Sequence, residues 1–364
     1  MGVAIFAVEK FTDMATLISQ PSSLCFSSVV EDIVFGTKAG SGVLVLDVVA
    51  GGNRLNVLTE TMYPGTDGSV TVSDLGSLVE PYARQHLQVT VECSFTDTAG
   101  KAAVSPVTIL FAMADVGTSA SEFTQNHFLT ILNGEKITAR GREERLYAYG
   151  ANKVTVTADM KMDAGYFLTK STEVNASGTT GNVSQFDVSP LRVEEVVGLT
   201  GGTLLGYTVE AGSRRQDFRC VTDQVLPAPS LIFTNSFGCQ EFIHCVGTHK
   251  KSSKYERNTA RILGRLRNYR ITEERQFTAN TGWLNEAMAD WADDLFRSEE
   301  VYLWVDGMVG RAVVVSDSKS EITNEDDNMP AFEFTYTYAQ RIHNVMQPDH
   351  AGRIFDNTFD HTFN

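Results

Sequence analysis

The chain has 364 residues, of which 45 are acidic and 30 are basic, so its formal net charge at pH 7 is −15. This length allows two or three domains with separate hydrophobic cores, and a content of 42% hydrophobic and 21% charged residues is typical of an ordered globular protein. The acidic balance argues against nucleic acid or an anionic membrane as a partner, because there is no cationic field to displace counterions from phosphates.

The N-terminal segment has neither a cationic leader nor an apolar run of signal-peptide length. No window approaches the roughly 18 uninterrupted apolar residues that a membrane helix needs. We therefore expect a protein that is made in the cytoplasm, has no signal peptide and is not inserted in a membrane. The cysteines are odd in number and scattered, which favours reduced, buried thiols: Cys25, Cys93, Cys220, Cys239 and Cys245.

Residues 1–114 are predicted to form a β-sandwich of the immunoglobulin-like type. Short runs of alternating hydrophobicity are separated by turn residues such as Gly51-Gly52, and this spacing favours a sandwich. Residues 75–84 are expected to form one or two helical turns. The hairpin over residues 91–112 is similar to those of bacterial immunoglobulin-like modules. Strands are expected at residues 41–49, 55–62, 70–75, 87–95 and 104–113.

A second β module is predicted over residues 115–226, after a connector at 115–125. The polar stretch 171–184 is expected to be an exposed loop, and residues 186–197 are expected to form a strand. The two prolines in Leu226-Pro-Ala-Pro229 cannot donate ladder hydrogen bonds and stiffen the backbone. They predict a boundary near residue 226. The other strands of this module are expected at 128–132, 136–140, 144–149, 153–160, 166–169, 204–210 and 214–221.

Residues 227–351 are predicted to be a β-rich domain with one prominent α-helix at about 282–297. The helix is indicated by apolar residues at three- and four-residue steps, and Asn280 or Thr281 is its expected N-cap. Its stripe, including Trp291, is interpreted as a core anchor rather than a ligand platform. Strands are expected at 231–233, 241–246, 260–266, 268–277, 301–305, 311–315 and 331–339.

The sequence predicts no catalytic residue, no cofactor and no metal site. The common nucleophile, zinc-protease, phosphate-loop and dinucleotide motifs are absent. The nearest set of zinc ligands is Cys239, His244, Cys245 and His249, but it lacks the usual two-to-four-residue spacing between cysteines. In addition, His244 and Cys245 are adjacent on a predicted strand, so their side chains point to opposite faces and cannot both reach one ion. The acidic loop 325–328 suggests calcium, but a solvated hairpin tip is favoured.

Two further patterns allow more than one interpretation. The basic run 249–275 is interpreted as a solvated strand face, with a groove for polyanions as the alternative. Period-two spacing places four aromatics of strand 331–339 on one face, and a core or interface face is favoured there over a sugar platform: Phe332, Phe334, Tyr336 and Tyr338.

Several phrases in the last third resemble tail and baseplate-type structural proteins of phages and prophages of Bacteroidetes. They are Asn235–Gly238 with the strand that follows, residues 276–303, 312–322 and 332–339, and the ending 353–364. Residues 58–83 in the first module have a similar, looser character. The resemblance implies a virion component and no enzymatic residues.

The sequence therefore predicts a non-enzymatic structural protein of a phage tail or baseplate, located in the virion. It is expected to work as a homo-oligomer or with other tail proteins, without binding nucleic acid. The tail 352–364 is predicted to form an assembly contact through Phe355, Phe359 and Phe363. The alternative is a carbohydrate-binding or adhesin protein that contacts a host surface glycan. A glycan-cleaving enzyme comes third, because no pair of carboxylates stands out.

Overall fold

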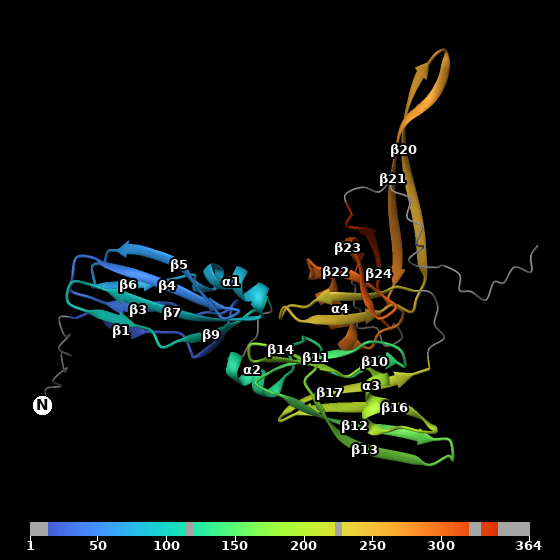
Figure 1. The fold of residues 1–364 in the computed structure, drawn as a ribbon, viewed down its shortest axis with the longest axis horizontal. Coiled ribbons are helices and arrows are strands. Elements are labelled where there is room, and N and C mark those ends of the chain that lie inside the picture. The colour runs from blue at the N-terminus through green and yellow to red at the C-terminus, as the bar shows by residue number, and fades with distance from the viewer. Residues whose placement is uncertain (1–13, 114–118, 223–227, 320–328, 341–364) are drawn as a thin grey trace, which may run out of the picture. The chain divides into compact units, whose positions relative to one another are not determined.

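The structure is a computed structural model, and it describes residues 14–113, 119–222, 228–319 and 329–340 (Figure 1). Over these residues the chain forms 24 strands in five sheets, with four helices. The predicted mainly β class is therefore confirmed. No helix in the described segments is long and apolar enough to cross a membrane.

The chain divides into two compact units. The first comprises Met1–Gln125 with Thr179–Ser184, and the second comprises Asn126–Gly178 with Gln185–Asn364. The predicted boundaries near residues 114 and 226 fall in segments 114–118 and 223–227, which lie outside the described residues. Those boundaries, and the separate tail at 352–364, stay predictions.

Unit 1 consists of two sheets around one core. The smaller sheet has the order β1-β3-β6, and the larger has the order β2-β9-β7-β4-β5, with β8 paired to β7. Apart from the parallel pair β2 and β9, neighbouring strands are antiparallel. The strands are β1 (Thr16–Ser19), β2 (Leu24–Phe26), β3 (Ile33–Gly36), β4 (Gly42–Ala50), β5 (Asn53–Met62), β6 (Ser69–Val72), β7 (Gln88–Thr96), β8 (Lys101–Ala103) and β9 (Val107–Leu110).

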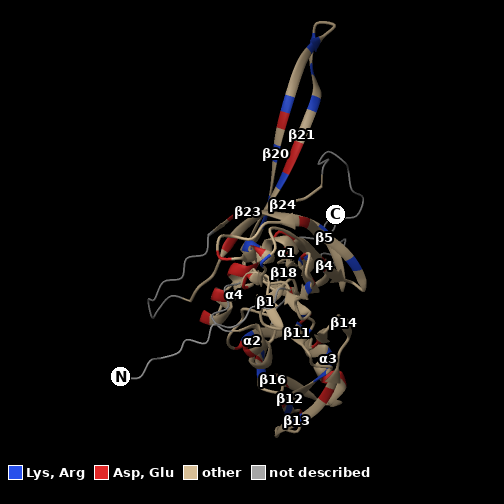
Figure 2. Cartoon of the chain, turned by 90° about the vertical axis from the view of Figure 1, so that its left-hand side faces the viewer, with Lys and Arg blue, Asp and Glu red and all other residues tan. Residues whose placement is uncertain are grey.

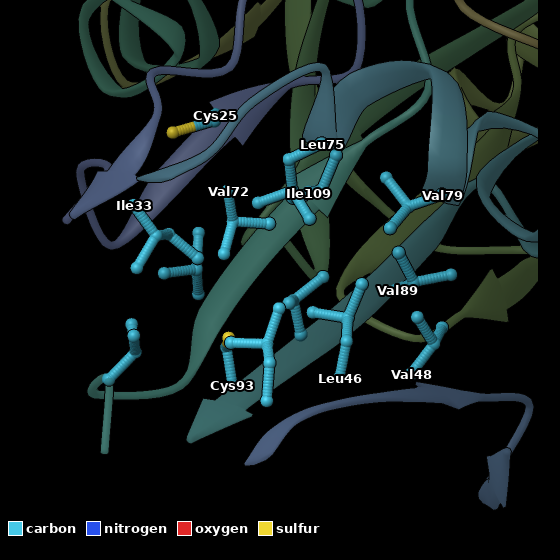
Figure 3. Packing of buried hydrophobic residues seen from close by; sticks show 14 of the residues in the cluster. Cys25, Ile33, Leu46, Val48, Val72, Leu75, Val79, Val89, Cys93 and Ile109 are labelled. Carbon is cyan, nitrogen blue, oxygen red and sulfur yellow. The ribbon is translucent and has the colours of Figure 1, made fainter. Parts of the chain in front are cut away.

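The core of unit 1 follows from the alternation that the sequence shows. In β4 every second residue is buried, so Leu46 and Val48 point inward together with Val89 of β7 and Ile33 of the opposite sheet (Figure 3). Gly42 is required by packing, because a Cβ there would lie 2.3 Å from the ring of Phe95.

Helix α1 (Leu75–His86) is longer than the one or two turns predicted for residues 75–84. Its buried residues Leu75, Val79 and Ala83 recur every four positions, which places them on one helical face. It has the same number of residues as α4. A second short helix, α2 (Ala120–Asn126), occupies part of the predicted connector.

The first half of unit 2 contains a five-stranded sheet of order β10-β17-β16-β12-β13. Here β10 pairs in parallel with β17, which joins the beginning of this segment to its end. A smaller sheet has the order β11-β15-β14. The strands are β10 (Lys136–Ala139), β11 (Arg145–Tyr149), β12 (Lys153–Met162), β13 (Phe167–Asn175), β14 (Gly178–Thr180), β15 (Val183–Asp187), β16 (Gly202–Ala211) and β17 (Arg214–Val221).

Two predictions for this segment were wrong. The stretch 171–184 is not one exposed loop, because the end of β13, all of β14 and the start of β15 lie within it. The predicted strand 186–197 is mostly helix α3 (Pro190–Val197), which begins after Ser189 with Pro190 in its first turn and ends at Gly198 in the left-handed conformation. Proline at the start and glycine after the end are helix signals, and they prevailed over the β-propensity of the valines between them.

The rest of unit 2 is built on a seven-stranded sheet of order β19-β18-β22-β23-β24-β21-β20, in which all neighbouring pairs are antiparallel. Helix α4 (Glu286–Arg297) packs its apolar stripe, centred on the fully buried Trp291, into the core of this sheet. The strands are β18 (Ser230–Thr234), β19 (Gln240–His244), β20 (His249–Ile262), β21 (Arg265–Asn280), β22 (Val301–Val305), β23 (Met308–Lys319) and β24 (Glu333–Tyr338).

Helix α4 begins four residues later than predicted. Its N-cap is Asn285, whose Oδ1 accepts a hydrogen bond of 2.8 Å from the backbone N–H of Met288. The two predicted caps have other partners: Asn280 Oδ1 accepts from Gly282 N, and Thr281 Oγ1 accepts from Phe332 N.

The two halves of unit 2 share side chains in one core. Leu132 belongs to the same buried cluster as Trp291 and Leu303, and the partly buried Ile137 packs against that cluster. Met288 Sδ also accepts a hydrogen bond of 3.1 Å from the backbone N–H of Ile137.

Candidate functional site

The residues considered for zinc already have other partners. His244 Nδ1 lies 2.8 Å from Ser230 Oγ and its Nε2 lies 3.1 Å from the carbonyl of Glu143. Burial lowers the pKa of His244 to about 3, so the ring is neutral at physiological pH. Burial also raises the pKa of the Cys245 thiol to about 12, so it stays protonated. Within the described residues no three His, Cys, Asp or Glu side chains gather closely enough to hold a metal ion.

The aromatic row of the last strand lies in the core, which confirms the favoured prediction. Phe332, Phe334, Tyr336 and Tyr338 are all buried in the cluster beneath α4. Phe277 stacks on Tyr336 with ring centroids 5.0 Å apart. These four side chains are therefore not available as a sugar platform.

The other predicted site residues lie outside the described residues. This applies to the tail residues Phe355, Phe359 and Phe363 and to the acidic loop 325–328. Their predicted roles stay predictions.

A buried group of charged side chains joins the two halves of unit 2. Lys136 Nζ donates to Glu144 Oε2 at 2.6 Å and to the carbonyl of Phe242 at 3.0 Å, and it lies 4.3 Å from the ring centroid of Trp291. Glu241 accepts hydrogen bonds from Trp291 Nε1 and from Asn235 Nδ2. Burial raises the pKa of Glu241. Because Lys136 contacts Phe242 and Trp291, which lie more than 100 residues away along the chain, its role is to fix how the two halves pack.

The feature that extends from the body of unit 2 is the hairpin of β20 and β21, here called the arm (residues 249–280). It is drawn in yellow-orange and projects from the sheet in Figure 1. The two strands pair along their whole length, from His249 opposite Ala279 to Ile262 opposite Arg265. Among the described residues, β24 pairs with the base of the arm alone, at Gln276–Asn280. The eleven residues from 265 to 275 therefore extend about 36 Å beyond the sheet.

The end of the arm is a two-residue turn. Leu263 has φ of 52° and Gly264 has φ of 78°, and two positive φ angles are the mark of the type I′ turns that close tight hairpins. The predicted single strand over 260–266 was wrong, because the turn at Leu263-Gly264 divides it between β20 and β21. The Leu263-Gly264 pair was the available signal.

The arm carries a charge opposite to that of the rest of the protein. Residues 249–280 contain nine Lys or Arg and three Glu, a formal charge of +6, so that −15 minus +6 leaves −21 on the remaining residues. Basic side chains recur along both strands in Figure 2. The prediction of a solvated strand face is confirmed, since nearly every residue of β20 and of the outer part of β21 is exposed.

The end of the arm also exposes large apolar side chains. Leu263 is 98% exposed, Leu266 69% and Tyr269 65%. Tyr269 is the extra residue of a β-bulge, because Asn258 pairs with Arg270 and Thr259 pairs with Asn268. An isolated two-stranded ribbon is marginally stable in water, and a third strand or a packed partner is what normally stabilises it. Among the described residues, the outer part of the arm therefore exposes apolar side chains on a ribbon of only two strands.

Fold and arm together define a mainly β protein with a projecting, positively charged hairpin. No protein-family model matches the chain, and no curated protein is significantly similar to it. The function is therefore inferred from the arm and from the sequence segments that resemble tail and baseplate proteins.

Proposed function

We propose that this protein is a non-enzymatic structural component of a phage virion, in the tail or baseplate, that assembles with its partners through the arm. The single observation that carries the proposal is the ribbon of about 36 Å that exposes Leu263, Leu266 and Tyr269 to solvent. A long hairpin of this kind suits strand addition or insertion into a neighbour's surface.

The rest of the proposal concerns the modules and the tail. We infer that unit 1 is an immunoglobulin-like β-sandwich and that the protein works as a homo-oligomer or with other tail proteins in the virion. The phrases that resemble tail and baseplate proteins support this assignment, and α4 and the last five residues of β21 lie within one of them. The tail residues Phe355, Phe359 and Phe363 remain a proposed second contact.

The arm can be removed without disturbing the sheet. Lys254 pairs with Glu274, so replacing residues 255–273 by Asn-Gly closes the ribbon with a type I′ turn in the existing register. We expect wild-type protein to form a defined oligomer by light scattering and electron microscopy, and the shortened protein to remain folded but monomeric. Deletion of residues 353–364 is measured in parallel, because it separates the contribution of the tail. An oligomer of unchanged size in the shortened protein would refute assembly through the arm.

The alternative, a carbohydrate-binding or adhesin protein, is tested with the same full-length protein on a glycan array. The row of aromatics that could have formed a sugar platform is buried. Binding to a defined glycan by a protein that stays monomeric would replace the assembly proposal.

A further inference from the structure

We infer that the arm of one copy of this chain docks on the acidic outer face of α4 in a second copy. The inference rests on the proposed function, and it names the partner and the surface that the arm binds. The acidic face is defined by Glu286, Asp290 and Asp293, and the exposed ring of Trp283 lies three residues before it in the chain.

The donor side of this contact is a row of arginines. Arg265 lies opposite Ile262, Arg267 opposite Ala260 and Arg270 opposite Asn258. Because positions 258, 260 and 262 alternate along β20, the three arginines share one face of the ribbon near its end. Within the described part of the chain none of the three forms an ion pair, so their charges are available to a partner.

The acceptor side has matching charge and spacing. Glu286, Asp290 and Asp293 lie four and seven residues apart, which places them on one side of the helix over about 10 Å. Neighbouring arginines on one face of a strand are about 7 Å apart, which is close to the roughly 6 Å rise between Glu286 and Asp290 along the helix. Acidic residues gather along α4 in Figure 2. Among the described residues Glu286 and Asp290 have no basic partner, while Asp293 lies 3.8 Å from Arg297.

The apolar groups of the two surfaces also correspond. Trp283 is 75% exposed and precedes Glu286 by three residues. On the arm, the exposed Leu263 lies at the turn, and the exposed Ile262 pairs with Arg265 and so shares the face of the arginines. An aromatic face can take both an apolar contact and an arginine guanidinium. Such a contact supplies the burial that the ribbon lacks by itself.

The contact joins different copies rather than parts of one chain. The arm continues from the β24 side of the sheet and extends about 36 Å away from it, whereas α4 packs in the core of that sheet. The two surfaces are different, so the contact is heterologous. Repetition of a heterologous contact gives a closed ring or an open filament.

Nucleic acid is the other polyanion that the arm's charge would suit. The remaining charge of −21 repels a phosphate backbone, while it favours an acidic protein surface as the partner of the arm. A second copy of this chain supplies that surface at the same concentration as the arm itself. We therefore assign the arm to the second copy.

The test is a charge-swap experiment on the full chain. Arg265→Glu/Arg267→Glu reverses the arm, and Asp290→Lys/Asp293→Lys reverses the acidic face. Each variant alone is expected to weaken self-association roughly tenfold or more, because like charges then meet. Mixing the two variants is expected to restore it, and wild-type association is expected to weaken as salt rises. Arg265→Lys/Arg267→Lys and Glu31→Lys/Asp32→Lys are the matched controls, with association near wild type.

The outcomes separate this inference from the proposed function. If the arm variant fails to associate but the α4 variant associates normally, the α4 contact is wrong and assembly through the arm stands. If neither variant affects association, or if wild-type protein is monomeric, the contact between copies is wrong. A labelled single-stranded oligonucleotide is titrated in parallel by fluorescence anisotropy. Binding that the arm variant loses, in a protein that does not self-associate, would assign the arm to nucleic acid. Thermal unfolding confirms that each variant is folded.

Discussion

Replacing Lys136 by methionine is expected to destabilise unit 2 strongly. Lys136 Nζ lies 2.6 Å from Glu144 Oε2, both side chains are buried, and Glu144 Oε1 has no hydrogen-bond partner within the described structure. Lys136→Met therefore leaves a carboxylate buried without its main counter-charge. The typical cost of breaking such a pair is about 3–5 kcal/mol in the free energy of unfolding. Arg142 interacts electrostatically with Glu144, so we expect a value near the lower end.

The measurement is chemical denaturation, followed by tryptophan fluorescence. All three tryptophans, Trp283, Trp291 and Trp304, lie in unit 2, so the signal reports that unit. The matched control is Lys136→Met/Glu144→Leu, which removes both charges. Replacing a buried ion pair by apolar residues is often neutral or stabilising, so the double variant is expected to recover most of the loss. A double variant as unstable as Lys136→Met, or a loss below about 1 kcal/mol in the single variant, would refute this account of the pair.

Three further predictions use the same assay. Asn285→Ala removes the N-cap of α4 and is expected to cost about 0.5–2 kcal/mol, whereas Asn285→Asp is expected to preserve it. Phe334→Ala is expected to lower the free energy of unfolding by about 3–5 kcal/mol, since the ring is buried in the core. An unchanged stability would contradict the placement of the aromatic row in the core. His244 has a folded pKa of about 3, below the ordinary value near 6.5. The unfolded state therefore binds the extra proton first, and stability falls as the pH drops from about 6.5 towards 3, by at most about 1.4 kcal/mol per pH unit. His244→Gln should flatten that slope, and an equal slope in both proteins would contradict it.

Local periodicity predicted much of the fold. The alternation in 41–49 and 331–339 correctly predicted strands and inward-facing residues, because a sheet face packed on a core requires period two. The stripe of Trp291 and Leu295 predicted α4 for the same reason at period 3.6. These patterns report burial, so they are informative wherever an element touches a core.

Where burial does not control the pattern, the sequence was less informative. Helix α3 has valines that suit a strand, and only Ser189-Pro190 and Gly198 mark its ends. The arm has no buried face beyond its base, so no apolar alternation sets its register. Its turn at Leu263-Gly264 places a leucine at positive φ, which local propensity does not favour. The shared core of the two halves of unit 2 depends on contacts about 150 residues apart, such as Ile137 with Met288, and no local pattern encodes these.

The shared core of unit 2 also determines when that unit can finish folding during synthesis. Leu132 and Lys136 are translated long before Trp291, yet their packing partners are in the C-terminal sheet and α4. Until the ribosome has made those elements, the first half of unit 2 exposes apolar surface, which promotes aggregation. Late contacts between distant segments also slow folding. In unit 1 the described members of the buried cluster lie within residues 15–111. That core can be buried first, so the nascent chain acquires its two units one after the other.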